Sequence, residues 1–128
     1  MRYNGVGILG TGSCLPPKII TNQEIEKNVN TTHDWINKKL GISERRILEN
    51  ELPSDIGYKA ALLALESASL SINDIDLIIV ATSSPEQISP STACIIHNKF
   101  NVEKNIPAFD INAVCSGFVY SINLISPL

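Results

Sequence analysis

Residues 77–81, L-I-I-V-A, restrict the fold of this chain more than any other segment. The run has the length of a strand, and it would carry no polar side chain on either of its two faces. A strand with one face in water alternates apolar and polar side chains, so this one must be covered on both faces. Residues 106–111 repeat the buried-strand pattern after an intervening stretch of helical character. The two segments therefore predict interior strands with helices around them.

The first third of the chain predicts one strand and two short helices. Residues 6–12 are apolar and glycine-rich, which indicates a first, buried strand before the turn that the following prolines impose. Residues 21–24 read T-N-Q-E, a capping box in which Thr21 and Glu24 satisfy each other's free backbone N–H groups. This pattern predicts a helix from Thr21 to about residue 29. A second short helix is expected after Thr32.

The remaining segments indicate further helices between and after the interior strands. We predict that Ser54 caps the clearest helix and that others span residues 92–99 and 116–124. Because strands alternate with helices, the fold class is α/β, with a mostly parallel or mixed sheet and helices on both faces. One small-residue face of the first of these helices is expected to pack on the sheet, and it comprises Ile56, Ala60, Leu63, Ala64, Ser67 and Ala68.

Composition and charge exclude several classes of function. A formal net charge of −3 with scattered basic residues argues against nucleic-acid binding. The sequence contains no run of about eighteen apolar residues, so no membrane-spanning helix is predicted. Cys14, Cys94 and Cys115 are an odd set without C-x-x-C spacing or histidine partners, so neither a disulfide framework nor a metal site is expected. A reducing cytoplasm fits this cysteine usage best.

Residues 107–118, P-A-F-D-I-N-A-V-C-S-G-F, carry the pattern most typical of a reactive site. A buried strand runs into a short turn, and a helix begins near Cys115. Free N–H groups at a helix N-terminus stabilise a thiolate, and small neighbouring residues let a substrate carbonyl approach the backbone. The Cys115 N–H could then donate to a developing oxyanion. A free cysteine is more often a buried packing residue, and the residues alone leave that alternative open.

The stretch F-D-I-N-A-V-C-S-G-F resembles the nucleophile motif of the β-ketoacyl-[acyl-carrier-protein] synthase III family, which has a thiolase-like fold. The resemblance covers the whole chain and implies that residues 1–128 are an incomplete N-terminal thiolase-like domain. Five further segments match the same family in order and at its spacing: G-T-G-S-C-L-P, T-T-H-D-W-I, G-I-S-E-R-R, D-L-I-I-V-A-T and P-S-T-A-C.

The glycines at residues 5–10 also match the pattern G-x-G-x-x-G. We do not interpret this match as a dinucleotide-binding site, because no βαβ unit frames it.

The resemblance implies an acyltransferase that initiates fatty acid synthesis. Cys115 would accept the acyl group of acetyl-CoA or a short acyl-CoA, which then condenses with malonyl-acyl-carrier protein as carbon dioxide leaves. The implied partners are these two substrates and, for the full-length enzyme, a second copy in a homodimer; no cofactor beyond the CoA thioester, no metal, no nucleic acid and no membrane is expected. The family's catalytic histidine and asparagine have no counterpart here, since His33 and His97 lie in other motifs.

The same resemblance assigns three residues to CoA binding. Trp35 matches a tryptophan that stacks on the adenine, although a lone tryptophan could equally be a core residue. Thr31 falls where the family hydrogen-bonds the ligand, and Lys39 stands where arginine is frequent, so it keeps the charge without the bidentate fork. Ser89 replaces a frequent aromatic residue, so no chain-length preference is predicted.

Two alternatives to this function stay open. The first is a related acyl-CoA condensing enzyme of the same fold, and the second is a truncated, catalytically silent fragment. Because a partial thiolase-like fold would expose apolar surface, we expect the chain alone to self-associate or aggregate.

Overall fold

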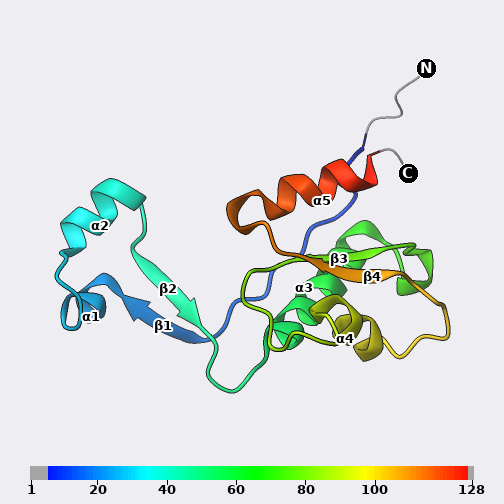
Figure 1. The fold of residues 1–128 in the computed structure, drawn as a ribbon, viewed down its shortest axis with the longest axis horizontal. Coiled ribbons are helices and arrows are strands. Elements are labelled where there is room, and N and C mark those ends of the chain that lie inside the picture. The colour runs from blue at the N-terminus through cyan, green and yellow to red at the C-terminus, as the bar shows by residue number, and fades with distance from the viewer. Residues whose placement is uncertain (1–5, 127–128) are drawn as a thin grey trace. The chain divides into compact units, whose positions relative to one another are not determined.

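The computed structural model describes residues 6–126, which form two compact units (Figure 1). The larger unit contains the described residues up to Cys14 and those from Leu52 onward. The smaller unit spans residues 15–51. Cys115 therefore belongs to the larger unit, whereas Thr31, Trp35 and Lys39 belong to the smaller one.

The centre of the larger unit is a parallel pair of strands. Strand β3 (Ile78–Ala81) pairs with β4 (Ala108–Ile111), with Ile78 opposite Ala108 and Ala81 opposite Ile111. Helix α4 (Thr92–Lys99) connects the two strands and packs against both. Helix α5 (Gly117–Ile125) contacts β3 from the other face (Figure 1). The prediction of an α/β fold with parallel strands and helices on both faces is confirmed.

Helix α3 (Pro53–Ala68) begins differently from the sequence prediction. The N-cap is Leu52, and its backbone N–H donates to the Asp55 carboxylate at 2.9 Å. The predicted cap at Ser54 is wrong, because proline at the first helical position has no N–H to satisfy and lets the helix start two residues earlier. Ser54 is instead fully buried within the first turn, where its N–H donates to Glu86 at 3.0 Å.

Helix α3 packs mainly against α4 rather than on the strands. The rings of Tyr58 and Phe100 meet edge to face with centroids 4.8 Å apart. Lys99 Nζ lies 2.8 Å from Asp55 Oδ1, and this hydrogen bond holds the pKa of the Asp55 carboxyl below its usual value. The predicted small-residue face is correct only in part, since Leu63 is exposed. Ala60, Ala64 and Ala68 of this face lie against Gly10 and Gly12 of the N-terminal segment, not on the strands.

The expected first strand is absent from the described part of the N-terminal segment. Residues 6–14 form no strand in the structure, and Ile8 and Leu9 are exposed. The backbone instead runs against α3, where a Cβ on Gly10 would lie only 2.5 Å from the Ala64 carbonyl oxygen and one on Gly12 would collide with that of Ala60. Glycine is thus required for close approach to a helix, not for a strand. The prediction is wrong because an apolar glycine-rich run fits both roles.

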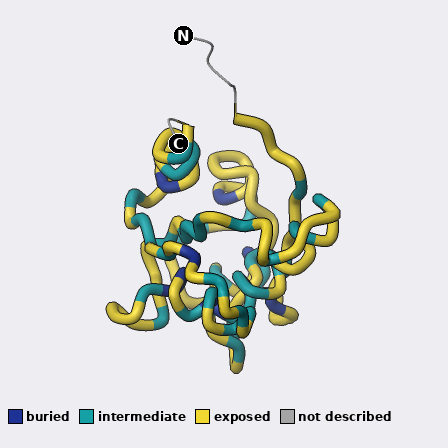
Figure 2. Tube along the Cα trace, turned by 90° about the vertical axis from the view of Figure 1, so that its right-hand side faces the viewer, coloured by how far each residue is buried: buried dark blue, intermediate teal, exposed yellow. Residues whose placement is uncertain are grey.

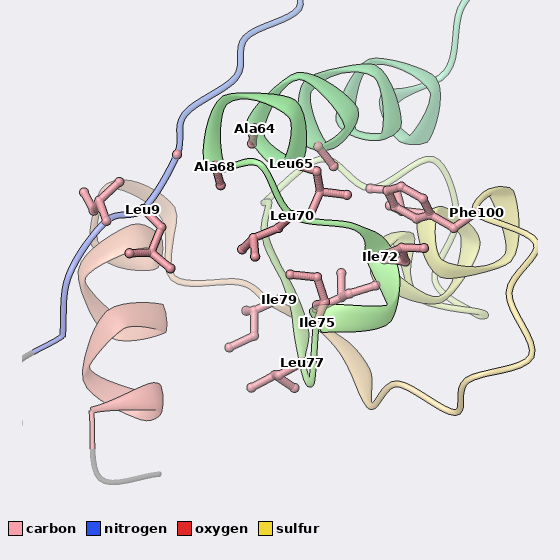
Figure 3. Close-up of a pocket in the computed structure, with 15 residues that line it drawn as sticks. Leu9, Ala64, Leu65, Ala68, Leu70, Ile72, Ile75, Leu77, Ile79 and Phe100 are labelled. Carbon is pink, nitrogen blue, oxygen red and sulfur yellow. The ribbon is translucent and has the colours of Figure 1, made fainter.

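An apolar groove of about 420 Å³ lies along β3, between the N-terminal segment and the C-terminal half of α3 (Figure 3). Leu9, Ala68 and Leu70 line one side of it, and Leu77 and Ile79 line another. All of its described lining residues are apolar. A site for a polar ligand needs a few placed polar groups, so we do not assign CoA to this groove.

The smaller unit consists of an antiparallel pair of strands and, between them in the sequence, two helices. Strands β1 (Lys18–Thr21) and β2 (Glu44–Ile47) are antiparallel, with Lys18 opposite Ile47. Helix α1 (Asn22–Glu26) begins at the predicted capping box but ends three residues before the expected position. Helix α2 (His33–Leu40) begins after its N-cap Thr32 and ends at Gly41, whose φ of 68° is a conformation that glycine adopts without strain.

Few side chains are fully buried along the described chain (Figure 2). The buried apolar side chains are Ala93, Ile96 and Ile106 in the larger unit and Pro16 and Ile36 in the smaller one. On α5, Phe118 and Leu124 are exposed, so the apolar surface expected from the sequence is present. Over residues 6–126, no helix combines the length and apolar character that crossing a membrane requires.

Candidate functional site

Cys115 lies in the turn between β4 and α5. Strand β4 ends at Ile111, a single 3₁₀ turn spans Val114–Ser116, and α5 begins at Gly117. The cysteine is exposed and forms no disulfide. Within the described chain, Cys115 is therefore accessible and is not buried as a packing cysteine would be.

Backbone contacts hold this turn at the carboxyl ends of both parallel strands. The Thr82 N–H, just after β3, donates to the Ile111 carbonyl at 3.0 Å. Gly117 is buried against the end of β3, since a Cβ there would lie 3.0 Å from the Ala81 Cβ. The carboxyl edge of a parallel sheet is where α/β proteins bind ligands. Cys115 is thus positioned where this architecture places chemistry.

The N-terminus of α5 differs from that of α4 in how its backbone donors are used. Asp110 and Ser91 accept hydrogen bonds from the first N–H groups of α4. At α5, by contrast, no side chain of the described residues acts as a cap. Uncapped N–H groups and the helix dipole favour an anion. The start of α5 can therefore support a thiolate or an oxyanion beside Cys115, whereas the start of α4 is already occupied.

Val114, the residue before Cys115, has a strained backbone. Its φ is 46°, in the left-handed region that a β-branched residue rarely adopts. Its side chain is 73% exposed, so burial does not compensate for the strain. Strained residues of this kind concentrate at active sites, where the surrounding structure fixes them. The conformation of Val114 supports a site at this turn.

We expect the variant Val114→Gly to be more stable than the wild type by about 0.5–1 kcal/mol, because removing the left-handed strain outweighs the added backbone entropy of the unfolded chain. Denaturant unfolding measures the difference. Val119→Gly is the matched control, since Val119 is exposed within α5 and has no strain to lose. That change should destabilise by about 0.5 kcal/mol. Equal effects of the two changes would refute strain at residue 114.

Asp110 fixes β4 to the start of α4. Its two carboxylate oxygens accept the N–H groups of Thr92 and Ala93, both at 2.8 Å. The Cys94 sulfur adds a contact to the Ala108 carbonyl at 3.4 Å, which agrees with a packing role for that cysteine. The strand that leads to Cys115 is thus held at two points. This role of Asp110 was not expected from the sequence, although a carboxylate inside an apolar strand is a signal that could have identified it.

Thr31 and Trp35 line the same depression in the smaller unit. The depression has a volume of about 440 Å³, and its other walls are Val29, Asn30 and Thr32. Trp35 is 55% exposed, so it is not a core residue of the described part of the smaller unit. Its indole is available to stack on a flat ring, and the threonines supply hydroxyl groups nearby.

Lys39 does not line this depression, but it lies close to it along α2. Lys39 stands four positions after Trp35, so the two side chains project from the same side of the helix. An ammonium group there can approach a phosphate held beside the indole. Both histidines make hydrogen bonds instead of lining a site: His97 Nε2 lies 3.1 Å from the Lys104 carbonyl, and His33 Nδ1 lies 3.2 Å from Asn22.

Comparisons with known proteins identify relatives that are similar to this chain in sequence. No protein-family model matches the chain. It is 50% identical over 123 residues to β-ketoacyl-[acyl-carrier-protein] synthase III of Clostridium acetobutylicum, covering 96% of this chain and 38% of that protein. A Vibrio vulnificus protein of the same name, with the suffix 1, is 52% identical, covering 91% of this chain and 37% of its own length. The chain thus spans little more than a third of these relatives.

Solved structures agree. The crystal structure of 3-oxoacyl-[acyl-carrier-protein] synthase III from Aquifex aeolicus VF5 matches with a TM-score of 0.86 and 43% identity, over 94% of this chain and 39% of that one. The priming β-ketosynthase of the R1128 polyketide biosynthetic pathway matches with a TM-score of 0.84 and 31% identity, over 93% and 36% of the two chains. Over the part that it spans, the chain is therefore similar to the β-ketoacyl-[acyl-carrier-protein] synthase III proteins and has their thiolase-like fold.

Proposed function

We propose that this chain supplies the acyl-accepting step of the reaction named in its relatives. Cys115 attacks the thioester carbonyl of acetyl-CoA or a short acyl-CoA, a new thioester forms on its sulfur, and free CoA leaves with the proton of the thiol. The acyl group then passes to malonyl-acyl-carrier protein as carbon dioxide is lost, which initiates fatty acid synthesis. We further propose that the protein works in the cytoplasm and as a homodimer.

The single observation that carries this proposal is the placement of Cys115. The thiol is exposed, follows a parallel strand, and precedes a helix whose N-terminus has no side-chain cap among the described residues. A nucleophile needs access, and the oxyanion that its attack creates needs backbone donors. Both requirements are met within three residues of the sulfur.

The depression beside Trp35 supports the choice of an acyl-CoA as the donor. The indole of Trp35 can stack on an adenine ring, and the threonine hydroxyls can form hydrogen bonds with the ligand. The ammonium group of Lys39 can attract a phosphate. We propose Trp35, Thr31 and Lys39 as the CoA-binding residues. We assign no part of the decarboxylation step to this chain, because its two histidines form hydrogen bonds with Asn22 and with the Lys104 carbonyl instead of lining the turn at Cys115.

A related condensing enzyme with another acyl donor is the second candidate. The chain resembles Xanthomonas campestris OleA as well, with a TM-score of 0.83 and 27% identity. The higher identity to synthase III proteins favours the first proposal.

The experiment that tests the proposal measures CoA released from acetyl-CoA in a single turnover. We expect one equivalent of CoA per chain without carrier protein, since the acyl group remains on Cys115. Addition of malonyl-acyl-carrier protein distinguishes a chain that completes the condensation, which consumes the acyl group, from one that performs only the acyl-accepting step, which retains it. A catalytically silent fragment releases no CoA from any acyl-CoA. A folded protein that releases no CoA from acetyl-CoA, yet does so from a longer acyl-CoA, would favour the second candidate.

A further inference from the structure

Asn22 is a fully buried polar side chain in a unit with little apolar core. It is the first residue of α1, and its exposed fraction is 0%. Within the described part of the smaller unit, Ile36 and Pro16 are the only apolar side chains in the buried class. Burial of so little apolar surface stabilises weakly, so hydrogen bonds must contribute more to holding these elements together.

The amide of Asn22 connects four segments of the smaller unit. Its Oδ1 accepts a hydrogen bond from the guanidinium of Arg45 on β2. Its Nδ2 donates to the Ile42 carbonyl at 2.7 Å and lies 3.2 Å from Nδ1 of His33, the first residue of α2. A guanidinium can only donate and a carbonyl can only accept, so the orientation of the amide is fixed. His33 Nδ1 therefore accepts the second amide proton.

These bonds fix the start of α2, which carries one wall of the depression. The Glu26 carboxylate, at the end of α1, also accepts the His33 backbone N–H. The segment between the two helices, which includes Thr31, is thus tied at both ends, and Trp35 lies within the first turn of α2. A shift of α2 would move Trp35 relative to Thr31 and reshape the depression.

We propose that Asn22 is a positioning residue for the depression formed by Val29, Asn30, Thr31, Thr32 and Trp35: its two amide protons hold α2 in the register that ligand binding requires. Asn22 lines no part of the depression itself and acts through α2. The identity of the ligand as CoA rests on the function proposed above, whereas the control of α2 by Asn22 does not.

The variant Asn22→Asp tests this directly. The carboxylate has the same shape and can still accept from Arg45, but it cannot donate to Ile42 or His33, and its second oxygen, an acceptor, faces the two acceptors that Nδ2 contacted. We expect CoA affinity to fall at least about tenfold, the effect of losing one well-formed hydrogen bond. Fluorescence of Trp35, the single tryptophan of the chain, reports binding.

Asn37→Asp is the matched control, because it makes the same chemical change at an exposed position of α2. It adds the same negative charge, so an equal loss of CoA affinity in both variants would mean that charge repulsion, not positioning, explains the effect. His33→Ala removes one acceptor and leaves the other two bonds of Asn22 in place. It should weaken CoA binding less than Asn22→Asp, which keeps the test valid if the latter fails to fold.

Amide hydrogen exchange over residues 31–40 provides a readout independent of any ligand. We expect faster exchange there in Asn22→Asp and His33→Ala, with unchanged exchange in α4 and unchanged alkylation of Cys115 in the other unit. Unchanged exchange over residues 31–40 in both variants would overturn the proposal. If the wild type itself binds no CoA while the variants accelerate exchange, the proposed ligand is wrong and the positioning role of Asn22 stands.

Discussion

Cys115→Ala should lose the release of CoA from acetyl-CoA by at least about 100-fold, because the thioester then has no nucleophile to attack it. The side chain is exposed and Cβ remains, so we expect the fold and the free energy of unfolding to change little. CoA binding, followed by Trp35 fluorescence, should also be unchanged. A large loss of acyl transfer with intact binding is the result that separates a nucleophile from a binding residue.

Cys94→Ala provides the comparison for this prediction. Cys94 is also a free, exposed cysteine, but its sulfur contacts the Ala108 carbonyl and it lies inside α4. Acyl transfer in that variant should be within about twofold of wild type, as for a change away from the reacting atoms. Equal losses in both variants would mean that the exposed thiols react without a specific site.

Asp110→Ala should have the largest effect on stability. It leaves the buried N–H groups of Thr92 and Ala93 without acceptors, each at a cost of about 1–3 kcal/mol, so the free energy of unfolding should fall by about 2–5 kcal/mol. Because β4 leads directly to the turn, alkylation of Cys115 by iodoacetamide should slow as well. Denaturant unfolding and the alkylation rate measure the two effects.

Two further variants refine this prediction. Asp110→Asn keeps one acceptor oxygen, so it should lose about half as much stability as Asp110→Ala. Asp76→Ala removes a carboxylate that pairs with Lys104 at 2.9 Å on an exposed surface, and it should change stability by no more than about 0.5 kcal/mol. A loss in Asp110→Ala no larger than that in Asp76→Ala would refute the role of Asp110 in joining α4 to β4.

The sequence predicted well those elements whose pattern has a single structural meaning. The capping box at Thr21 starts α1 as expected, and α4 spans the predicted residues 92–99. The apolar runs at residues 77–81 and 106–111 contain the parallel strands β3 and β4. Local hydrogen bonding and strand-length hydrophobicity determine these elements, so they can be identified without knowledge of the tertiary structure.

The errors arise where one pattern permits two structures. Glycine-rich residues 6–12 suit a strand, yet Gly10 and Gly12 are needed for close approach to α3. Ser54 is a good helix cap by type, yet Pro53 starts the helix earlier. The spacing of small residues on α3 predicted that this helix packs on a sheet, whereas α3 packs mainly against helix α4. Each outcome depends on contacts between distant segments, which single-sequence patterns do not contain.

The sequence alone pointed to only one residue of the candidate site, the nucleophile Cys115. The proposed CoA-binding residues came from the family resemblance. Nothing in the sequence indicated that Val114 would be strained, because φ is set by the whole turn. Asn22 gave no signal either, since a polar residue in the first turn of a helix is ordinary. Its importance follows from the arrangement of Ile42, His33 and Arg45 around it, which only the fold brings together.

The central claim is that Cys115 accepts the acyl group, and mass spectrometry of the wild-type protein after incubation with acetyl-CoA tests it most directly. We predict a single acetyl adduct that peptide mapping assigns to Cys115, with Cys14 and Cys94 unmodified. Folded protein without an adduct, or with acetyl groups spread over all three cysteines, would contradict the assignment.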